Sequence, residues 1–310
     1  MLKPSEFELV EIGETFGPRP LLVDGHWAKS FAYALDDYSP WWFAHSPFGG
    51  PIAMPWALAK EMLATFRLRY DPSGAAGLQQ KNEVRYHQPV ALGSTLALSA
   101  KFVEKYHKRG KGYTVLESQA RNQAGTLLVS QRSTMIIELP KGVVPKPPTQ
   151  EAAAQRVVTQ WPEHLPPAAR AHANLVAGTP IMSLVKDLRQ GHMSIFSAVA
   201  DHRINVHNNQ EKARRAGFPD CVAQGAMSVC WLSEMLATFF GPEWLRSGWI
   251  SVVFLHGIFP GERLTCRAVV TEVRDTDKGR ELALDIWTEN QDGSRATVGR
   301  ATGLALDDRT

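Results

Sequence analysis

The chain has 310 residues, of which 44% are hydrophobic, and this is enough for two domains of ordinary size, each with a core of its own. Its formal net charge of +3 at pH 7 is too small for a nucleic-acid-binding tail, although basic loops could receive an anionic ligand. The sequence has no signal-peptide pattern, no long apolar run and no paired spacing among its three cysteines, so it predicts a cytoplasmic protein without membrane partners, disulfides or a metal site.

The first half of the chain combines a helix with strands. Residues 49–66 are largely apolar all round, which predicts a buried helix. Alternating strand-like runs follow at 82–104 and 112–139, and the second of them contains the turn sequence NQAG at 122–125. A segregated helix followed by an antiparallel meander is typical of the α+β class.

The segment 140–172 differs in composition from what precedes it, because it is rich in proline. Proline stiffens a connecting segment, so we predict a linker here. The linker divides the chain into an N-terminal domain at 1–139 and a C-terminal domain at 173–310.

The second half repeats the order of the first. The hexapeptide EMLATF occurs at 61–66 and again at 234–239, in the middle of an apolar run each time. Around the second copy, 221–239 predicts another buried helix, and strand-like runs follow at 250–273 and 279–306 with turn glycines at matching places. Such an echo indicates that one domain has been duplicated.

One stretch of the second half carries a distinctive set of residues. His207 is followed by Ala-Gly-Phe at 216–218 and then by Gly225, which opens the predicted helix. This order and spacing is similar to the hydratase motif of MaoC-like dehydratases and (R)-specific enoyl-CoA hydratases, and 252–264 resembles the strand that follows the motif in that family. The resemblance covers nearly the whole chain. It implies a double hotdog, in which two tandem domains each wrap an antiparallel sheet around a central helix.

The resemblance also implies roles for individual residues. His207 would be the general acid/base that moves a proton to or from water at the β-carbon of an acyl thioester. Backbone N–H groups at the helix start, at Gly225 and the preceding Gln224, would stabilise the enolate oxygen. Asn205 is a further candidate for contact with substrate or water, although asparagines in such a cluster more often satisfy turn backbone.

The sequence departs from the family pattern in both halves. Five residues before the histidine, where the family has Asp, stands His202, and Asp201 lies one position further away, on the opposite face of an extended segment. The first half keeps an acid, Asp37, but has Trp42 where the histidine would stand. The resemblance therefore implies a degenerate first half and one active site in the second half, with Asp201, His202 and Asp37 as further candidate catalytic residues.

The leading hypothesis is a hydro-lyase that hydrates 2-enoyl thioesters and dehydrates 3-hydroxyacyl thioesters. Coenzyme A or an acyl carrier protein would carry the substrate, and no other cofactor is expected. Two alternatives stay open: a site redirected to another dehydration, isomerisation or cyclisation on a carrier-bound substrate, and a non-catalytic subunit that binds acyl thioesters. The sequence predicts no nucleic-acid partner. It leaves open whether two chains associate into a homodimer.

Overall fold

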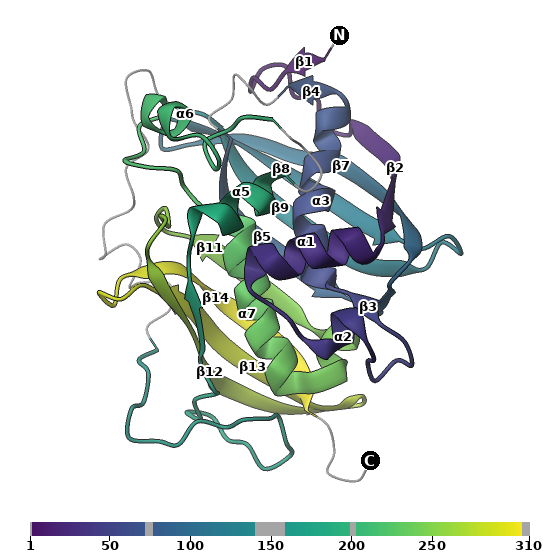
Figure 1. The fold of residues 1–310 in the computed structure, drawn as a ribbon, viewed down its shortest axis with the longest axis vertical. Coiled ribbons are helices and arrows are strands. Elements are labelled where there is room, and N and C mark those ends of the chain that lie inside the picture. The colour runs from purple at the N-terminus through teal and green to yellow at the C-terminus, as the bar shows by residue number, and fades with distance from the viewer. Residues whose placement is uncertain (1, 72–76, 140–158, 199–202, 306–310) are drawn as a thin grey trace.

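The computed structural model describes residues 2–71, 77–139, 159–198 and 203–305 (Figure 1). The helices and strands of the first half, with η for a 3-10 helix, are β1 (Lys3–Pro4), β2 (Thr15–Val23), α1 (Gly25–Leu35), α2 (Pro40–Phe43), β3 (Ile52–Ala53), η1 (Pro55–Ala57), α3 (Leu58–Leu63), η2 (Ala64–Leu68), β4 (Tyr70–Asp71), β5 (Leu78–Tyr86), β6 (Val90–Ala91), β7 (Ser94–Lys108), β8 (Lys111–Arg121) and β9 (Leu127–Glu138). Those of the second half are β10 (Leu184–Asp187), α5 (Gln190–Ala198), α6 (Gln210–Arg215), α7 (Gly225–Phe240), η4 (Gly241–Glu243), α8 (Trp244–Ser247), β11 (Trp249–Phe254), β12 (Arg263–Thr276), β13 (Gly279–Glu289) and β14 (Arg295–Ala305).

The frame of the molecule is one antiparallel sheet of ten strands in the order β10-β12-β13-β14-β11-β5-β9-β8-β7-β2. Figure 1 shows α1, α3 and α7 on the same face of this sheet, with α7 running across the strands of the second half. Each half supplies five neighbouring strands and a helix that packs on them, which confirms the predicted α+β class.

The two halves meet at the centre of the sheet, where β5 pairs antiparallel with β11. Glu83 faces Ser251 in this pair, and Val84 faces Ile250 next to it. Glu83 and Ser251 occupy equivalent positions of the repeat, because they are 168 residues apart, which is also the separation between the turn glycines Gly93 and Gly261. The halves are therefore related by a pseudo-twofold axis that passes through this pair of residues.

The turn glycines confirm the repeat at the level of the backbone. Gly93 and Gly261 have φ of 86° and 89°, and Gly125 and Gly293 have φ of 80° and 76°. Residues with a Cβ rarely adopt these positive angles, so both copies need glycine at the same two turns. The predicted hairpins form as β8–β9 and β13–β14.

Both central helices begin later than predicted. In the first half, 49–66 is not one helix, because β3 and η1 precede α3 and η2 follows it. Pro51 and Pro55 explain this, since proline lacks the N–H of a helix interior and disfavours helical backbone in the residue before it. In the second half α7 begins at Gly225 rather than at 221, because Val222 and Ala223 bond to the backbone of Val206 and Ile258 instead.

The repeated hexapeptide has the same structural use in both halves. Glu61 of the first copy lies 3.0 Å from the Arg19 guanidinium of β2, and Glu234 of the second lies 2.8 Å from the Lys186 ammonium of β10. β2 and β10 are the two edge strands of the sheet. Each central helix is thus joined to the edge strand of its own half by a short contact between this glutamate and a basic side chain.

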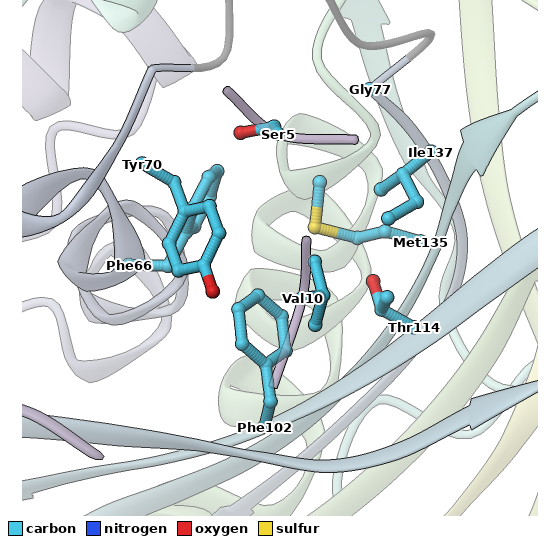
Figure 2. A pocket seen from close by; sticks show the side chains of 9 residues that line it. All are labelled: Ser5, Val10, Phe66, Tyr70, Gly77, Phe102, Thr114, Met135 and Ile137. Carbon is cyan, nitrogen blue, oxygen red and sulfur yellow. The ribbon is translucent and has the colours of Figure 1, made fainter. Parts of the chain in front are cut away.

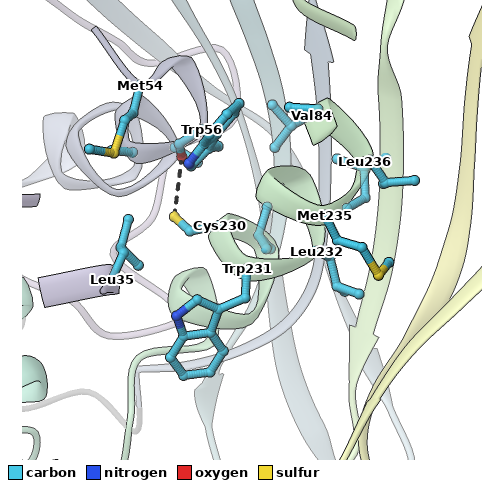
Figure 3. Close-up of a cluster of buried hydrophobic side chains, with 14 of the residues drawn as sticks. Leu35, Met54, Trp56, Val84, Cys230, Trp231, Leu232, Met235 and Leu236 are labelled. Atoms are coloured by element: carbon cyan, nitrogen blue, oxygen red, sulfur yellow. Dashed lines mark hydrogen bonds between the residues drawn. The ribbon is translucent and has the colours of Figure 1, made fainter. Parts of the chain in front are cut away.

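The apolar core runs through both halves without interruption. Figure 3 shows α7 packed against η1 and its neighbours, where the Cys230 thiol donates to the Trp56 carbonyl at 3.6 Å. Tyr86 of β5 and Ser233 of α7 share a buried hydrogen bond of 2.9 Å. The domain limits 1–139 and 173–310 stay a prediction.

Candidate active site

His207 lies in the loop before α6 and is fixed at both its backbone and its ring. Its ring Nδ1 is 2.6 Å from the carbonyl oxygen of Val222, and its own carbonyl accepts from Gln190 of α5 at 3.0 Å. A carbonyl oxygen only accepts, so Nδ1 carries the hydrogen. Nε2 is left with a lone pair, which is the form of histidine that can take a proton.

The surroundings of His207 favour the uncharged ring. Burial, followed by the positive charges of Arg67 and Lys60, lowers the pKa of His207 to about 4, against the opposing effect of the bond to Val222. The imidazole is therefore neutral over the whole physiological pH range. Both cations belong to the first half, Lys60 to α3 and Arg67 to η2.

Gly225 and Gln224 stand at the start of α7, close to the point where the His207 ring is held. Val222 is three residues before Gly225, so at most about 11 Å of extended backbone separates them. Gln224 is the N-cap residue, but its side chain makes no capping hydrogen bond. The N–H groups of the first turn are thus not covered by this side chain.

Glycine at position 225 is required by packing. A Cβ placed there would come within 2.9 Å of the Phe254 ring at the end of β11. The aromatic ring therefore lies directly against the Gly225 backbone, at the start of the helix.

Asn205 has its side chain engaged within the loop itself. Its amide oxygen accepts from the backbone N–H of His207 at 2.8 Å, and Asn208 in turn accepts from the backbone N–H of Asn205. Asn209 caps α6 by accepting from Lys212 N. These asparagines shape the turn that carries His207, and a direct role of Asn205 toward substrate stays a prediction.

The Ala-Gly-Phe sequence at 216–218 ends α6. Gly217 has φ of 87°, and the N–H of Phe218 bonds back to the carbonyl of Ala213. A glycine in the left-handed region is the usual end of a helix. The segment between His207 and Gly225 thus contains one short helix, α6, which Asn209 caps at its start and Gly217 ends.

Asp37 is buried in the first half and is bonded to Trp42. Its carboxylate accepts from the Trp42 indole at 3.0 Å and from the N–H of Ser39 at 3.3 Å. Burial raises the pKa of Asp37, and its charge in turn raises the pKa of Glu234, which burial and Asp37 together bring to about 8. Glu234 is nine residues, or about 13 Å along the helix, beyond Gly225.

The structure therefore brings His207 and the start of α7 together, and it puts Asp37 with Glu234 in a separate cluster. Asp201 and His202, the candidates for the partner of His207, lie outside the described residues. Lys60 and Arg67 had not been predicted as neighbours of His207. Only the repeat itself could have indicated them, because a pseudo-twofold arrangement can place a loop of one half over the helix of the other.

Figure 2 shows a small pocket in the first half. Nine residues line it: Ser5, Val10, Phe66, Tyr70, Gly77, Phe102, Thr114, Met135 and Ile137. The wall is mostly apolar, and the hydroxyls of Ser5 and Thr114 are buried without a hydrogen-bond partner. None of the nine is a predicted site residue.

Two kinds of feature are absent from the described ranges. No three side chains of the His, Cys, Asp or Glu type gather there closely enough to hold a metal ion. None of the helices in these ranges is long and apolar enough to cross a membrane.

Solved structures with the same arrangement are available for comparison. A MaoC-like dehydratase superposes with a TM-score of 0.76 at 16% identity, over 97% of this chain and 100% of the other. A protein of Mycobacterium tuberculosis with a double hotdog fold superposes with a TM-score of 0.66 at 14% identity, over 97% and 98% of the two chains. The fold is a double hotdog.

A third double-length match is the MaoC-like dehydratase of Phytophthora capsici, with a TM-score of 0.66 at 15% identity over 97% of both chains. No family model matches the chain, and no curated protein sequence matches it either. At these identities the comparison establishes the double hotdog, which extends over nearly the whole chain.

Proposed function

We propose that this double hotdog protein is a hydro-lyase of the MaoC-like type, which adds water to 2-enoyl thioesters and removes it from 3-hydroxyacyl thioesters. The observation that carries the proposal is the state of His207: its Nδ1–H is donated to Val222, which is three residues before the start of α7, and its Nε2 keeps a lone pair that can act as a base. The fold shared with MaoC-like dehydratases supports the same chemistry.

In the hydration direction, Nε2 of His207 takes a proton from water as the water oxygen bonds to C3 of the enoyl group. The electron pair of the double bond moves toward the thioester, where the enolate oxygen accepts from N–H groups at the α7 N-terminus. The imidazolium then returns the proton to C2, so that one water has been added and the histidine is neutral again. Dehydration follows the same steps in reverse.

The test replaces His207 by Gln, which keeps a polar side chain but removes the base. We expect hydration of 2-enoyl-CoA substrates, followed by the loss of ultraviolet absorbance of the conjugated thioester, to fall by at least about 100-fold. His87→Gln is the matched control, because His87 is also partly buried and bonded, to Ser130 at 2.9 Å, but lies in the first half. Wild-type turnover in the His207→Gln protein would refute the proposal.

A second candidate is a non-catalytic subunit that binds acyl thioesters. It is favoured by one observation: among the described residues, the charged groups that shift the pKa of His207 are cations, and no carboxylate is among them. This candidate predicts that an acyl-CoA binds to the wild-type protein in calorimetry while its absorbance stays constant. Turnover by the isolated protein excludes it.

A further inference from the structure

The loop that carries His207 is held in place from two sides. On one side, the His207 ring donates to the carbonyl oxygen of Val222 at 2.6 Å, just before α7. On the other side lies α5, where the Gln190 amide donates to the His207 carbonyl at 3.0 Å. A second bond to α5 joins the Asn208 amide to the Ser197 hydroxyl at 3.2 Å. The place of the ring nitrogen Nε2 therefore depends on α5 as well as on the segment before α7.

The sequence of α5 separates a polar stripe from an apolar one. Gln190, Ser194 and Ser197 are spaced at i, i+4 and i+7, so they lie along one face of the helix. Gln190 also donates to the Ser194 hydroxyl at 3.0 Å, which helps to orient its amide group. Met193 and Phe196 belong to another face and are 1% and 0% exposed. The polar stripe thus bonds to the His207 loop, while the apolar stripe anchors the helix in the core.

The helix α5 packs on α1, which belongs to the first half. The Phe196 ring meets the Phe31 ring edge-on with centres 5.5 Å apart, and the His192 ring meets the Tyr33 ring in the same way at 5.4 Å. Gly191 permits a close approach, since a Cβ there would lie 3.3 Å from the Tyr33 hydroxyl. Close-packed aromatic contacts leave little room for movement, so α5 is a firm support for the loop. The half without the hydratase motif thereby supports the element that holds His207.

The Gln190 amide nitrogen is the atom that faces His207. A carbonyl oxygen only accepts, so the amide can bond to it with its N–H group and not with its own oxygen. A side chain of the same length without an N–H group would therefore lose this anchor and keep its packing.

We propose that Gln190 is a positioning residue of the hydro-lyase, which fixes the His207 backbone so that Nε2 keeps a constant place relative to the start of α7. The physical reason is that an acid/base group moves a proton only at hydrogen-bonding distance, so a displacement of about 1 Å can slow a reaction by about 100-fold. In this role Gln190 acts through His207 rather than on the substrate. The inference rests on the proposed function, but the anchoring of the loop can be measured without any substrate.

The first test replaces Gln190 by Met, which has a similar length but no N–H group. We expect kcat for the hydration of 2-enoyl-CoA substrates to fall by about 10- to 100-fold, while KM changes by less than about twofold. A displaced base slows the chemical step without removing a contact to the bound substrate. Gln210→Met is the matched control and should keep the wild-type kcat, because Gln210 lies nearby on α6 and donates to Asp220 at 3.1 Å rather than to His207.

The second test follows the His207 ring by proton NMR. Its Nδ1–H is donated to a carbonyl oxygen 2.6 Å away, so it should give a downfield signal that exchanges slowly with water and is lost in His207→Gln. In Gln190→Met the exchange of this proton should become about 10-fold faster, since the loop opens more often when one of its anchors is missing. In Gln210→Met the rate should stay as in the wild type.

A folded Gln190→Met protein with the wild-type kcat would overturn the inference, and so would a loss confined to KM. If Gln190→Met does not fold, Gln190→Glu decides, because its carboxylate keeps the length of the side chain and offers no N–H to the His207 carbonyl. If the wild type hydrates no thioester and yet exchange is faster in Gln190→Met, the anchoring stands and the proposed reaction fails.

Discussion

Gly225 is constrained in two ways: it is the first residue of α7, and its Cα lies against the Phe254 ring. We expect Gly225→Ala to destabilise the protein by about 1–3 kcal/mol, since the new Cβ would be only 2.9 Å from that ring. Phe254→Leu in the same chain should recover part of this loss. The measurement is a double-mutant cycle of urea unfolding, and additive effects of the two substitutions would contradict the packing argument.

His207 also couples the stability of the fold to pH. The folded-state pKa of about 4 lies below the ordinary value of 6.5, so between these values the unfolded chain binds a proton that the folded chain does not. Stability from this group is therefore present above pH 6.5 and is lost as the pH falls toward 4. We expect the wild type to lose about 1 kcal/mol per pH unit more than His207→Gln in this window. Urea unfolding of both proteins at pH 5 and pH 6.5 measures this difference. If the free energy of unfolding changes by the same amount between the two pH values in wild type and in His207→Gln, the prediction is wrong.

At the scale of single elements, the buried ion pair of Arg19 and Glu61 fastens α3 to the edge strand β2. Glu61 is fully buried and Arg19 is 23% exposed in its side chain, so Arg19→Met would leave a carboxylate in the core without its nearest hydrogen-bonding cation. We expect a loss of about 3–5 kcal/mol in chemical unfolding, with partial recovery when Glu61→Gln is added.

The exposed pair of Lys81 and Glu83 provides the comparison, with side chains 44% and 34% exposed. Lys81→Met should cost less than about 1 kcal/mol. A similar small cost for Arg19→Met would mean that the ion pair does not hold α3 in place.

Glu234, the equivalent of Glu61, should respond to pH in the opposite sense to His207. Its folded-state pKa of about 8 lies above the ordinary 4.5, so the folded chain holds a proton that the unfolded chain has released. The stability from this group is present below pH 4.5 and is lost as the pH rises to 8.

We therefore expect the stability of Glu234→Gln, relative to wild type, to rise by about 2 kcal/mol between pH 5.5 and pH 7.5. Thermal unfolding at both pH values measures this difference, and contributions from other groups cancel because both proteins share them. A difference that does not change with pH would sink the prediction.

The elements that the sequence predicts well are those governed by local chemistry. Alternating apolar residues and turn glycines such as Gly93 and Gly261 fix the strands and hairpins, since each acts over a few residues. The helix starts were predicted too early, because Pro55 in one half and backbone bonds of Val222 in the other break an apolar run that composition alone cannot divide.

For the whole molecule, the continuous sheet and shared core predict that the two halves unfold together. β5 and β11 would each become an exposed edge if the halves separated, and the Tyr86–Ser233 bond would be lost. We expect a single transition in differential scanning calorimetry, with equal calorimetric and van 't Hoff enthalpies. Two resolved transitions would show that the halves are independent.

The candidate site is predictable only in part, and the reason lies at this largest scale. The spacing from His207 to Gly225 is a local signal and was visible in the sequence. Lys60 and Arg67 are more than one hundred residues away from His207 in sequence, and they belong to the other half, so no local pattern indicates that their charges lower its pKa.

The pairing of equivalent residues at the β5–β11 junction has an evolutionary consequence. Glu83 facing Ser251, with Asn82 facing Val252 and Val84 facing Ile250, is the pattern of a self-complementary contact between two identical subunits. In a homodimer of that kind every mutation alters both subunits at once. Joining two copies in one polypeptide removes that constraint, and the halves now differ at equivalent places: Trp42 follows Asp37 by five residues in the first half, and His207 lies before the helix start in the second.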